Sequence, residues 1–240
     1  MRSVEDDFWW YRGLRGLACR QVVRAVRGLA APRVLDAGCG TGGMMRALRS
    51  ALPEADLTGV DLSSRAVELA GQRAVGAILE APIECLPFGE GSFDAAVCLD
   101  VLYIDSVNEH TAARELRRVL KTGGRLILNL PAFECLRGEH DRAVHTARRY
   151  TKMRARRLLE ETGFIVEKLF YWNALFFPAL AVWRPLSGFL SRGRERVISD
   201  LRPFPRPLNA ALGAYLEAET RFAARCGLPF GSSVFAVAVK

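Results

Sequence analysis

The sequence predicts an α/β fold, in which helices cover both faces of one doubly wound, mainly parallel sheet of seven strands. Short apolar runs alternate with stretches of helical periodicity from residue 33 onwards. Glycine-rich or acidic residues follow several of these runs, where ligands bind in such sheets. A length of 240 residues and a hydrophobic share of 50% suffice for a single domain, residues 1–240, with a complete core.

The expected elements follow from apolar runs and from capping residues. Ser63 is a suitable cap for a helix over 65–74, and Ser106 with Glu109 forms a capping box for a helix that runs to about Leu120. Further helices are predicted over 44–52 and 151–162. The seven predicted strands are 33–36, 55–61, 76–81, 92–100, 125–131, 164–171 and 232–240.

Two segments lie outside this alternation. Residues 1–30 predict an N-terminal helical cap, since apolar residues recur there at helical spacing. Residues 173–231 hold most of the prolines and predict an inserted lid or substrate-binding segment between strands six and seven. The apolar run 169–183 is too short to span a bilayer. A buried strand with a core helix, a hydrophobic substrate lid and peripheral membrane contact all remain open for it.

Composition excludes several classes of function. The six cysteines form no CxxC pair, so we expect free, mostly buried thiols, no metal site and a cytoplasmic location. The N-terminus is acidic and aromatic, unlike a signal peptide. The net charge of +8 comes almost entirely from arginines spread over the whole chain, so we expect no nucleic-acid partner. The oligomeric state is left open.

The segment VLDAGCGTGG, residues 34–43, predicts a ligand site. Gly38 and Gly40 let the backbone approach a ligand, and the helix that follows offers free N–H groups. A nicotinamide cofactor would place its pyrophosphate there, against Asp36 and with no arginine inside the loop. A ligand with an ammonium and a sulfonium, such as S-adenosylmethionine, suits that carboxylate better. Asp61, at the end of the second strand, is a bidentate acceptor for two ribose hydroxyls.

Four motifs in order resemble those of class I S-adenosylmethionine-dependent methyltransferases, which have a Rossmann-like fold. They are VLDAGCGTG, VDLS, IECLPFGEGSFDAAVCLDVL and RVLKTGGRLILNLP, and the resemblance covers roughly residues 31–171. The chain is also similar to a methyltransferase type 11/12-like subgroup with WWYRG near the N-terminus and HD…RRYT later. The resemblance identifies the cofactor better than the acceptor.

The resemblance implies roles for individual residues. The methionine part would lie on Asp36 and on the backbone of Gly38 and Gly40, with the Leu99 carbonyl near its ammonium. Asp61 would bind the ribose hydroxyls. Leu62, the Ile83 backbone and Glu84 would border the adenine, although Glu84 is equally well explained as a solvated loop acid. Two departures are visible: Pro82 stands where many relatives carry Asp, and Tyr103-Ile104 where relatives often carry Glu-His.

Methyl transfer requires alignment of the acceptor and sometimes a base. The polar segment 138–152 follows strand five, and we expect His140, His145 and Tyr150 to be catalytic. A surface loop that caps the next helix is the alternative. We expect the acceptor to contact Tyr11, Arg12, Tyr103, Arg149 and Asn173, although the aromatic residues near Tyr11 also suit a staple that holds the first helix.

The function predicted from the sequence is methyl transfer from S-adenosylmethionine to oxygen or nitrogen of a small-molecule acceptor, such as a natural product or a sugar. Three alternatives stay open. They are a methyltransferase for a lipid-linked or membrane-bound acceptor, a cofactor-binding partner subunit without catalysis, and a nicotinamide oxidoreductase, which Asp36 disfavours.

Overall fold

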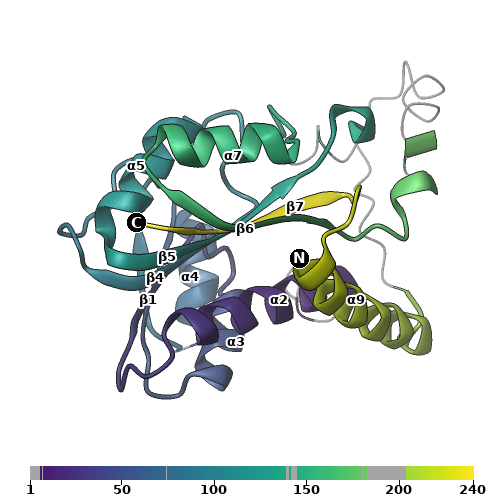
Figure 1. Ribbon diagram of the computed structural model, residues 1–240. Helices are drawn as coiled ribbons and strands as arrows, with labels where there is room; N and C mark the ends of the chain where they lie inside the picture. Colours follow the sequence, from purple (N-terminus) through teal and green to yellow (C-terminus); the bar gives the residue numbers. More distant parts are fainter. Residues whose placement is uncertain are drawn as a thin grey trace.

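A single seven-stranded sheet forms the centre of the molecule. The computed structural model describes residues 6, 8–73, 75–138, 141, 145–179, 181–182 and 204–240. The strands are β1 Arg33–Ala37, β2 Asp56–Asp61, β3 Ala77–Glu80, β4 Phe93–Leu99, β5 Leu120–Pro131, β6 Ile165–Trp172 and β7 Ser233–Val239. Their order is β3-β2-β1-β4-β5-β7-β6, and only β7 runs antiparallel to its neighbours (Figure 1). The predicted fold class is confirmed.

Helices cover both faces of this sheet. One face carries α2, α3 and α9, and the opposite face carries α5 and α7 (Figure 1). Strand β1 shows why both faces are covered: Val34 packs into the core beneath α2, whereas Leu35 packs into the core beneath α5. The helices are α2 Trp9–Ala25, α3 Gly43–Ala51, α4 Ser64–Gly71, α5 Glu109–Val119, α7 Lys152–Glu161 and α9 Arg206–Cys226, with a 3-10 turn η1 at Glu134–Leu136.

The long connection between β6 and β7 contains the 21-residue helix α9. This helix packs along α2, where a Cβ at Gly13 would overlap Leu216 Cδ2, so glycine is needed for the close approach. Residues 183–203 lie outside the described residues. The lid predicted for 173–231 therefore stays a prediction, as do the predicted segment boundaries.

The start of α5 differs from the predicted capping box. Asn108, not Ser106, is the N-cap, and its side chain accepts a hydrogen bond from Thr111 N at 3.0 Å. The carboxylate of Glu109 is used elsewhere, since it accepts a hydrogen bond from Tyr150 Oη and pairs with Arg154 at 3.2 Å. The local pattern could not show these partners, which come from a distant part of the chain.

The cysteine prediction holds in part. All six cysteines are free thiols. Cys85, Cys135 and Cys226 are exposed, so the expectation that most thiols are buried is wrong. Each exposed cysteine lies outside the strands of the sheet.

Candidate functional site

The carboxyl ends of β1, β2, β4 and β5 meet at one edge of the sheet, because these strands are parallel and adjacent. Strand register places Asp36 beside Gly59 and Val97, and Leu99 beside Asn129. The amides of Gly38 and Cys39 both donate to the Val60 carbonyl, at 2.8 and 2.9 Å. The loop after β1 is therefore fixed to the end of β2.

Two glycines of this loop are needed for different reasons. Gly38 and Gly40 have φ values of +80° and +53°, a region that L residues rarely adopt. A Cβ at Gly38 would overlap Val101 Cγ2, so packing requires glycine there. A Cβ at Gly40 would meet no atom within 4 Å. Gly40 thus faces open space, and this space lets a ligand approach the backbone.

Asp61 lies beside this open space. Its Oδ2 accepts a hydrogen bond from Gly40 N and its Oδ1 one from Ser63 N, both at 2.9 Å. Each carboxylate oxygen can accept at least two hydrogen bonds, so each keeps one position for a ligand. The next side chain, Leu62, is apolar and 64% exposed. A fixed bidentate acceptor beside an exposed apolar side chain suits a ribose and its base.

Asp36 is more enclosed than the sequence suggested. Its side chain is 3% exposed at the end of β1. Helix α2 lies close to it, because the charges of Asp36 and of the buried Arg15 both act on Cys19 in α2. Burial first, and then Asp36, raise the pKa of Cys19 to about 12. The positive charge of Arg15 opposes the negative charge of Asp36 at Cys19 and lowers the pKa of this thiol.

The segment before α2 is held against the glycine loop. Arg73 Nη2 pairs with Asp6 at 3.0 Å, and its Nε donates to the Thr41 carbonyl at 2.6 Å. Asp6 also pairs with Arg46 of α3 at 3.2 Å. Further along, Trp10 stacks on Trp172 with ring centroids 5.7 Å apart. The segment before α2 therefore lies beside the glycine loop, and whether the aromatic residues of α2 contact a ligand stays a prediction.

Of the residues expected at the adenine edge, Glu84 is bonded to the residue that caps α5. Ile83 is buried, and Glu84 Oε1 accepts a hydrogen bond from Asn108 N at 3.0 Å. Glu84 is therefore not a merely solvated acid. Its role toward a ligand stays a prediction.

Asp100 is the site residue that sequence reasoning missed. It follows β4 with a φ of +61°, and its Oδ1 accepts a hydrogen bond from Asn129 Nδ2 at 2.9 Å. Asn129 is fully buried, and its own Oδ1 accepts from Trp172 Nε1 at 2.8 Å. Burial raises the pKa of Asp100 to about 7, although the hydrogen bond from Asn129 lowers it. The available signal was an Asp at the end of a predicted strand.

The raised pKa of Asp100 gives a first prediction. Its ordinary value is 3.8, so the folded protein binds the proton more tightly than the unfolded chain. The stability gained from this proton is complete below about pH 4 and is lost as the pH rises through about 7. Asp100→Asn, which keeps an acceptor for Asn129, should therefore stabilise the fold more at about pH 8 than at about pH 5.

Urea unfolding at both pH values measures this difference. The matched control is Asp56→Asn, which changes an exposed carboxylate at the start of β2, away from the carboxyl ends of the strands. It should shift the free energy of unfolding by less than about 0.5 kcal/mol at either pH. An equal effect of Asp100→Asn at both pH values would show that the Asp100 carboxyl titrates normally.

Tyr11 and Tyr103 come together near Asp100. Burial raises the pKa of Tyr103, and the neighbouring Asp100 and Tyr11 raise it further. Both tyrosines are half-buried. Arg12, the next residue of α2, is exposed and makes no described contact with this group. Of the three residues, Tyr11 and Tyr103 thus lie near Asp100 at the end of β4, and their contact with an acceptor stays a prediction.

The described residues of the polar segment 138–152 are more structural than predicted. His140 lies outside the described residues, and His145 is exposed in a turn with a φ of +52°. Arg149 is 6% exposed, and its guanidinium makes two hydrogen bonds to Asp141, at 2.8 and 3.0 Å. It also donates to the Ala132 carbonyl at 2.7 Å. Arg149 therefore fixes this segment to the end of β5, and that role occupies the fork expected to bind an acceptor.

Tyr150, expected to be catalytic, is completely buried. Its hydroxyl contacts the Leu102 carbonyl at 3.3 Å and the Glu109 carboxylate. Burial and Glu109 raise the pKa of Tyr150. A buried hydroxyl that already has two partners cannot reach an acceptor, so this placement favours a structural role.

A second prediction follows for Tyr150→Phe. The change should lower the free energy of unfolding by about 1–3 kcal/mol, because it removes a buried hydrogen bond to a charged group. Urea denaturation measures the loss. Unchanged stability would mean that the hydroxyl contributes nothing to the fold, and its catalytic role would return to consideration.

Asn173 ends β6 at the same edge of the sheet. It is 5% exposed with a φ of +58°, and its Nδ2 donates to Ser232 Oγ at 2.6 Å. Its Oδ1 is buried and has no hydrogen-bond partner among the described residues, and the same holds for Trp9 Nε1. Trp9 packs against Phe176, three residues after Asn173, with ring centroids 5.2 Å apart. A buried acceptor and a buried donor thus remain available in this region.

The described residues offer neither a metal site nor a membrane span. They contain no group of three histidine, cysteine or acidic side chains able to hold a metal ion. No helix in the described part of the chain combines the length and the hydropathy of a membrane span.

The sequence comparisons agree with the motifs. A family model described as a methyltransferase domain matches residues 35–128. A ubiquinone/menaquinone biosynthesis C-methyltransferase from Syntrophotalea carbinolica is 36% identical over 121 residues, covering 47% of this chain and 51% of that protein. A malonyl-[acyl-carrier protein] O-methyltransferase from Herminiimonas arsenicoxydans is 34% identical over 136 residues, covering 54% and 51%. The chain thus spans about half the length of the curated relatives that it matches.

Solved structures match over almost the whole chain. The methyltransferase in complex with the Haloferax volcanii Trm112 activator gives a TM-score of 0.64 at 20% identity, covering 99% of this chain and 91% of that one. A geranyl diphosphate C-methyltransferase from Streptomyces coelicolor, in complex with S-adenosyl-L-homocysteine, gives 0.61 at 16%, covering 94% and 79%. Identities this low support the fold alone.

Proposed function

We propose that this chain, which has the class I methyltransferase fold and matches a methyltransferase-domain family model over residues 35–128, transfers a methyl group from S-adenosylmethionine to a small-molecule acceptor. The observation that carries the proposal is the pairing of Asp61 with the open space at Gly40. Each Asp61 oxygen is fixed by a backbone amide and keeps one position for a ribose hydroxyl.

The described residues fit this cofactor. Leu62 is exposed where an adenine would pack, and Ile83 and Glu84 would border its edge. The methionine part would lie along Gly38 and Gly40, with Asp36 and the Leu99 carbonyl near its ammonium. When bound, the cofactor supplies an electrophilic methyl group. The chain's own contribution is to bind it, to orient the acceptor and to exclude water.

We infer that the acceptor lies beside Asp100, Tyr103 and Tyr11, at the end of β4. An acceptor hydroxyl or amine loses a proton as its oxygen or nitrogen gains the methyl group, and the Asp100 carboxylate is placed to take that proton. Asn129 orients this carboxylate, and Trp172 orients Asn129. His145 is exposed, and it remains a second candidate base together with His140.

We propose that Asn173 of the protein binds the polar group of the acceptor. An unpaired buried carbonyl oxygen costs about 1–3 kcal/mol, and a hydroxyl or amine of the acceptor would remove that cost. Trp9 Nε1 supplies a donor near the same segment. Because a hydroxyl group can both donate and accept a hydrogen bond, this buried acceptor and donor favour an acceptor molecule that carries a hydroxyl. Arg12 would contact the acceptor only at the edge of the site.

A methyl-transfer assay tests the proposal. The protein is incubated with methyl-labelled S-adenosylmethionine and a panel of phenols, amino sugars, a demethylated quinone and malonyl-acyl carrier protein. The last two represent the reactions named for the relatives. Label on a phenol or amino sugar supports the proposal. Label on the quinone or the carrier protein alone would move the acceptor to those classes. Cofactor binding without any transfer would favour the partner-subunit alternative.

A further inference from the structure

Helix α9 presents an apolar stripe to solvent. Leu208, Tyr215 and Phe222 follow one another at intervals of seven residues, which places them on one side of the helix. Their exposed fractions are 45%, 39% and 56%. The small residues between them, Ala211 and Ala218, are exposed too. The stripe runs the length of a helix of roughly 30 Å.

The opposite side of α9 explains why this stripe is not core. Leu216, Thr220 and Ala223 are buried against the rest of the protein. The helix therefore has one buried apolar side and a second apolar side that no described residue covers. Figure 1 shows α9 beside α2 at the outer edge of the molecule. Large exposed apolar patches usually mark sites of interaction.

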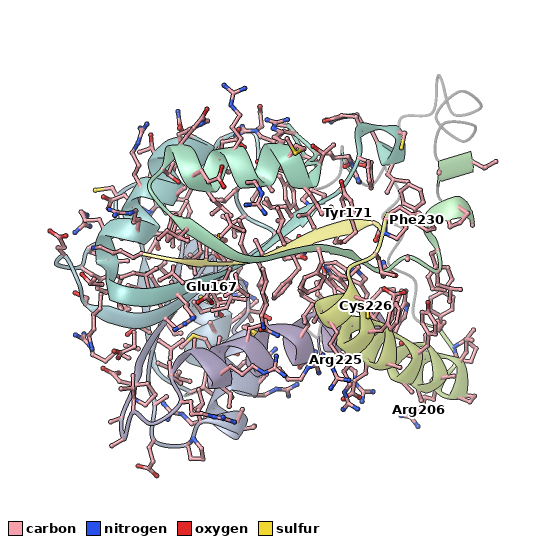
Figure 2. The ribbon with its side chains drawn as sticks, in the orientation of Figure 1. Glu167, Tyr171, Arg206, Arg225, Cys226 and Phe230 are labelled. Atoms are coloured by element: carbon pink, nitrogen blue, oxygen red, sulfur yellow. The ribbon has the colours of Figure 1, made fainter. Side chains whose placement is uncertain are left out.

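Positive charge accompanies the stripe. Arg206 and Arg225 lie at the two ends of α9 and have no partner among the described residues (Figure 2). Arg221 is exposed as well. The positive charges of Arg221 and Arg24 both help to lower the pKa of Arg20 in α2, so these arginines lie near one another. Glu217 is the one exposed acid of α9, and it pairs with Arg20 and Arg221. The rim of the stripe is therefore basic.

We propose that the stripe of Leu208, Tyr215 and Phe222 rests on the surface of an anionic lipid bilayer, with α9 lying in the interface plane. Aromatic and aliphatic side chains enter the acyl boundary, and the flanking arginines meet lipid phosphates. A second copy of the chain fits less well, because each copy carries a net charge of +8 and would bring the same basic rim.

Exposed apolar residues continue toward the site edge of the sheet. Leu175 follows β6 by three residues, and Phe230 precedes β7 by three. Phe230 stacks on Phe177, with ring centroids 5.1 Å apart. Leu175 comes two residues after Asn173 and is 49% exposed, so apolar surface also borders the acceptor site of the proposed function. Membrane binding itself requires neither cofactor nor turnover.

Vesicle flotation of the full chain tests the proposal. Vesicles of phosphatidylcholine with one third phosphatidylglycerol should carry the protein at low salt, and vesicles of phosphatidylcholine alone or high salt should carry much less. The double variant Leu208→Ser/Phe222→Ser should lower the partition coefficient at least tenfold, because two side chains lose their apolar contact with lipid.

The matched control is Met153→Ser/Ile165→Ser. These two residues are 76% and 70% exposed and lie outside α9, in α7 and β6, so partition should be unchanged. Size-exclusion chromatography is run alongside. Three outcomes overturn the proposal. They are no binding to anionic vesicles, an equal fall of the partition coefficient in the control variant, or a dimer that depends on Phe222 and does not bind vesicles. None of them bears on cofactor binding, which is measured separately.

Discussion

Asp61→Ala is expected to weaken binding of S-adenosylmethionine by roughly 100-fold. Two ribose hydroxyls would lose a charged acceptor, at about 1.5 kcal/mol each, and together these losses correspond to about two decades in Kd. The loop also loses two anchors, because Asp61 accepts from Gly40 N and Ser63 N. Calorimetric titration of the variant and of the unchanged protein measures the difference.

The control for Asp61 is Asp56→Ala. Asp56 begins the strand that Asp61 ends, and it pairs at 3.4 Å with the exposed Arg33. A surface pair of this kind contributes at most about 1 kcal/mol to stability and lies far from the glycine loop. Cofactor affinity should stay unchanged in this control. An Asp61→Ala protein that is folded and binds with unchanged affinity would remove Asp61 from the site.

Gly40→Ala should reduce cofactor affinity at least about 100-fold with only a small loss of stability. The backbone at Gly40 has a φ of +53°, so alanine costs about 1–2 kcal/mol there. Its new methyl group meets no protein atom within 4 Å and points into the space proposed for the ligand. The loss should therefore appear in binding, through overlap with the cofactor.

Two other glycines separate these effects. Gly28→Ala carries the same backbone cost, since its φ is +87° and no atom lies within 4 Å of a Cβ, but it lies outside the loop. The Gly28→Ala variant should therefore be as stable as the Gly40→Ala variant and should bind the cofactor as tightly as the unchanged protein. Gly38→Ala should lose more stability than either, because its Cβ overlaps the stiff side chain of Val101. Normal cofactor affinity in Gly40→Ala would show that the open space is not the ligand site.

Much of the fold was accessible to sequence reasoning because it depends on local patterns. Most strands of the sheet are short apolar runs, and the acidic residues Asp36 and Asp61 lie at the carboxyl ends of β1 and β2. The ends of parallel strands meet by topology, so the ligand edge followed from strand order alone. The cap of α5 was misplaced because Asn108 and Ser106 are equally good capping residues and Glu109 is used by Tyr150.

The chemistry of individual side chains was less accessible, because burial and distant partners decide it. Tyr150 and Arg149 carry polar groups typical of catalysis, yet Glu109 and Asp141 hold them within the structure. Asp100 shows the opposite error, because no function was predicted for it. Its ordinary position after a strand did not reveal the positive φ, the buried Asn129 beneath it or the raised pKa. Each of these features depends on the tertiary packing of β4, β5 and β6.

The most direct test of the central claim is calorimetric titration of the unmodified protein with S-adenosylmethionine and, separately, with NADH. The choice of these two ligands matters because a glycine-rich loop followed by a helix N-terminus can also bind a pyrophosphate. We expect saturable binding of S-adenosylmethionine and none of NADH. Binding of NADH alone would contradict it, and the roles proposed for Asp61, Gly40 and Asp100 in methyl transfer would fall together.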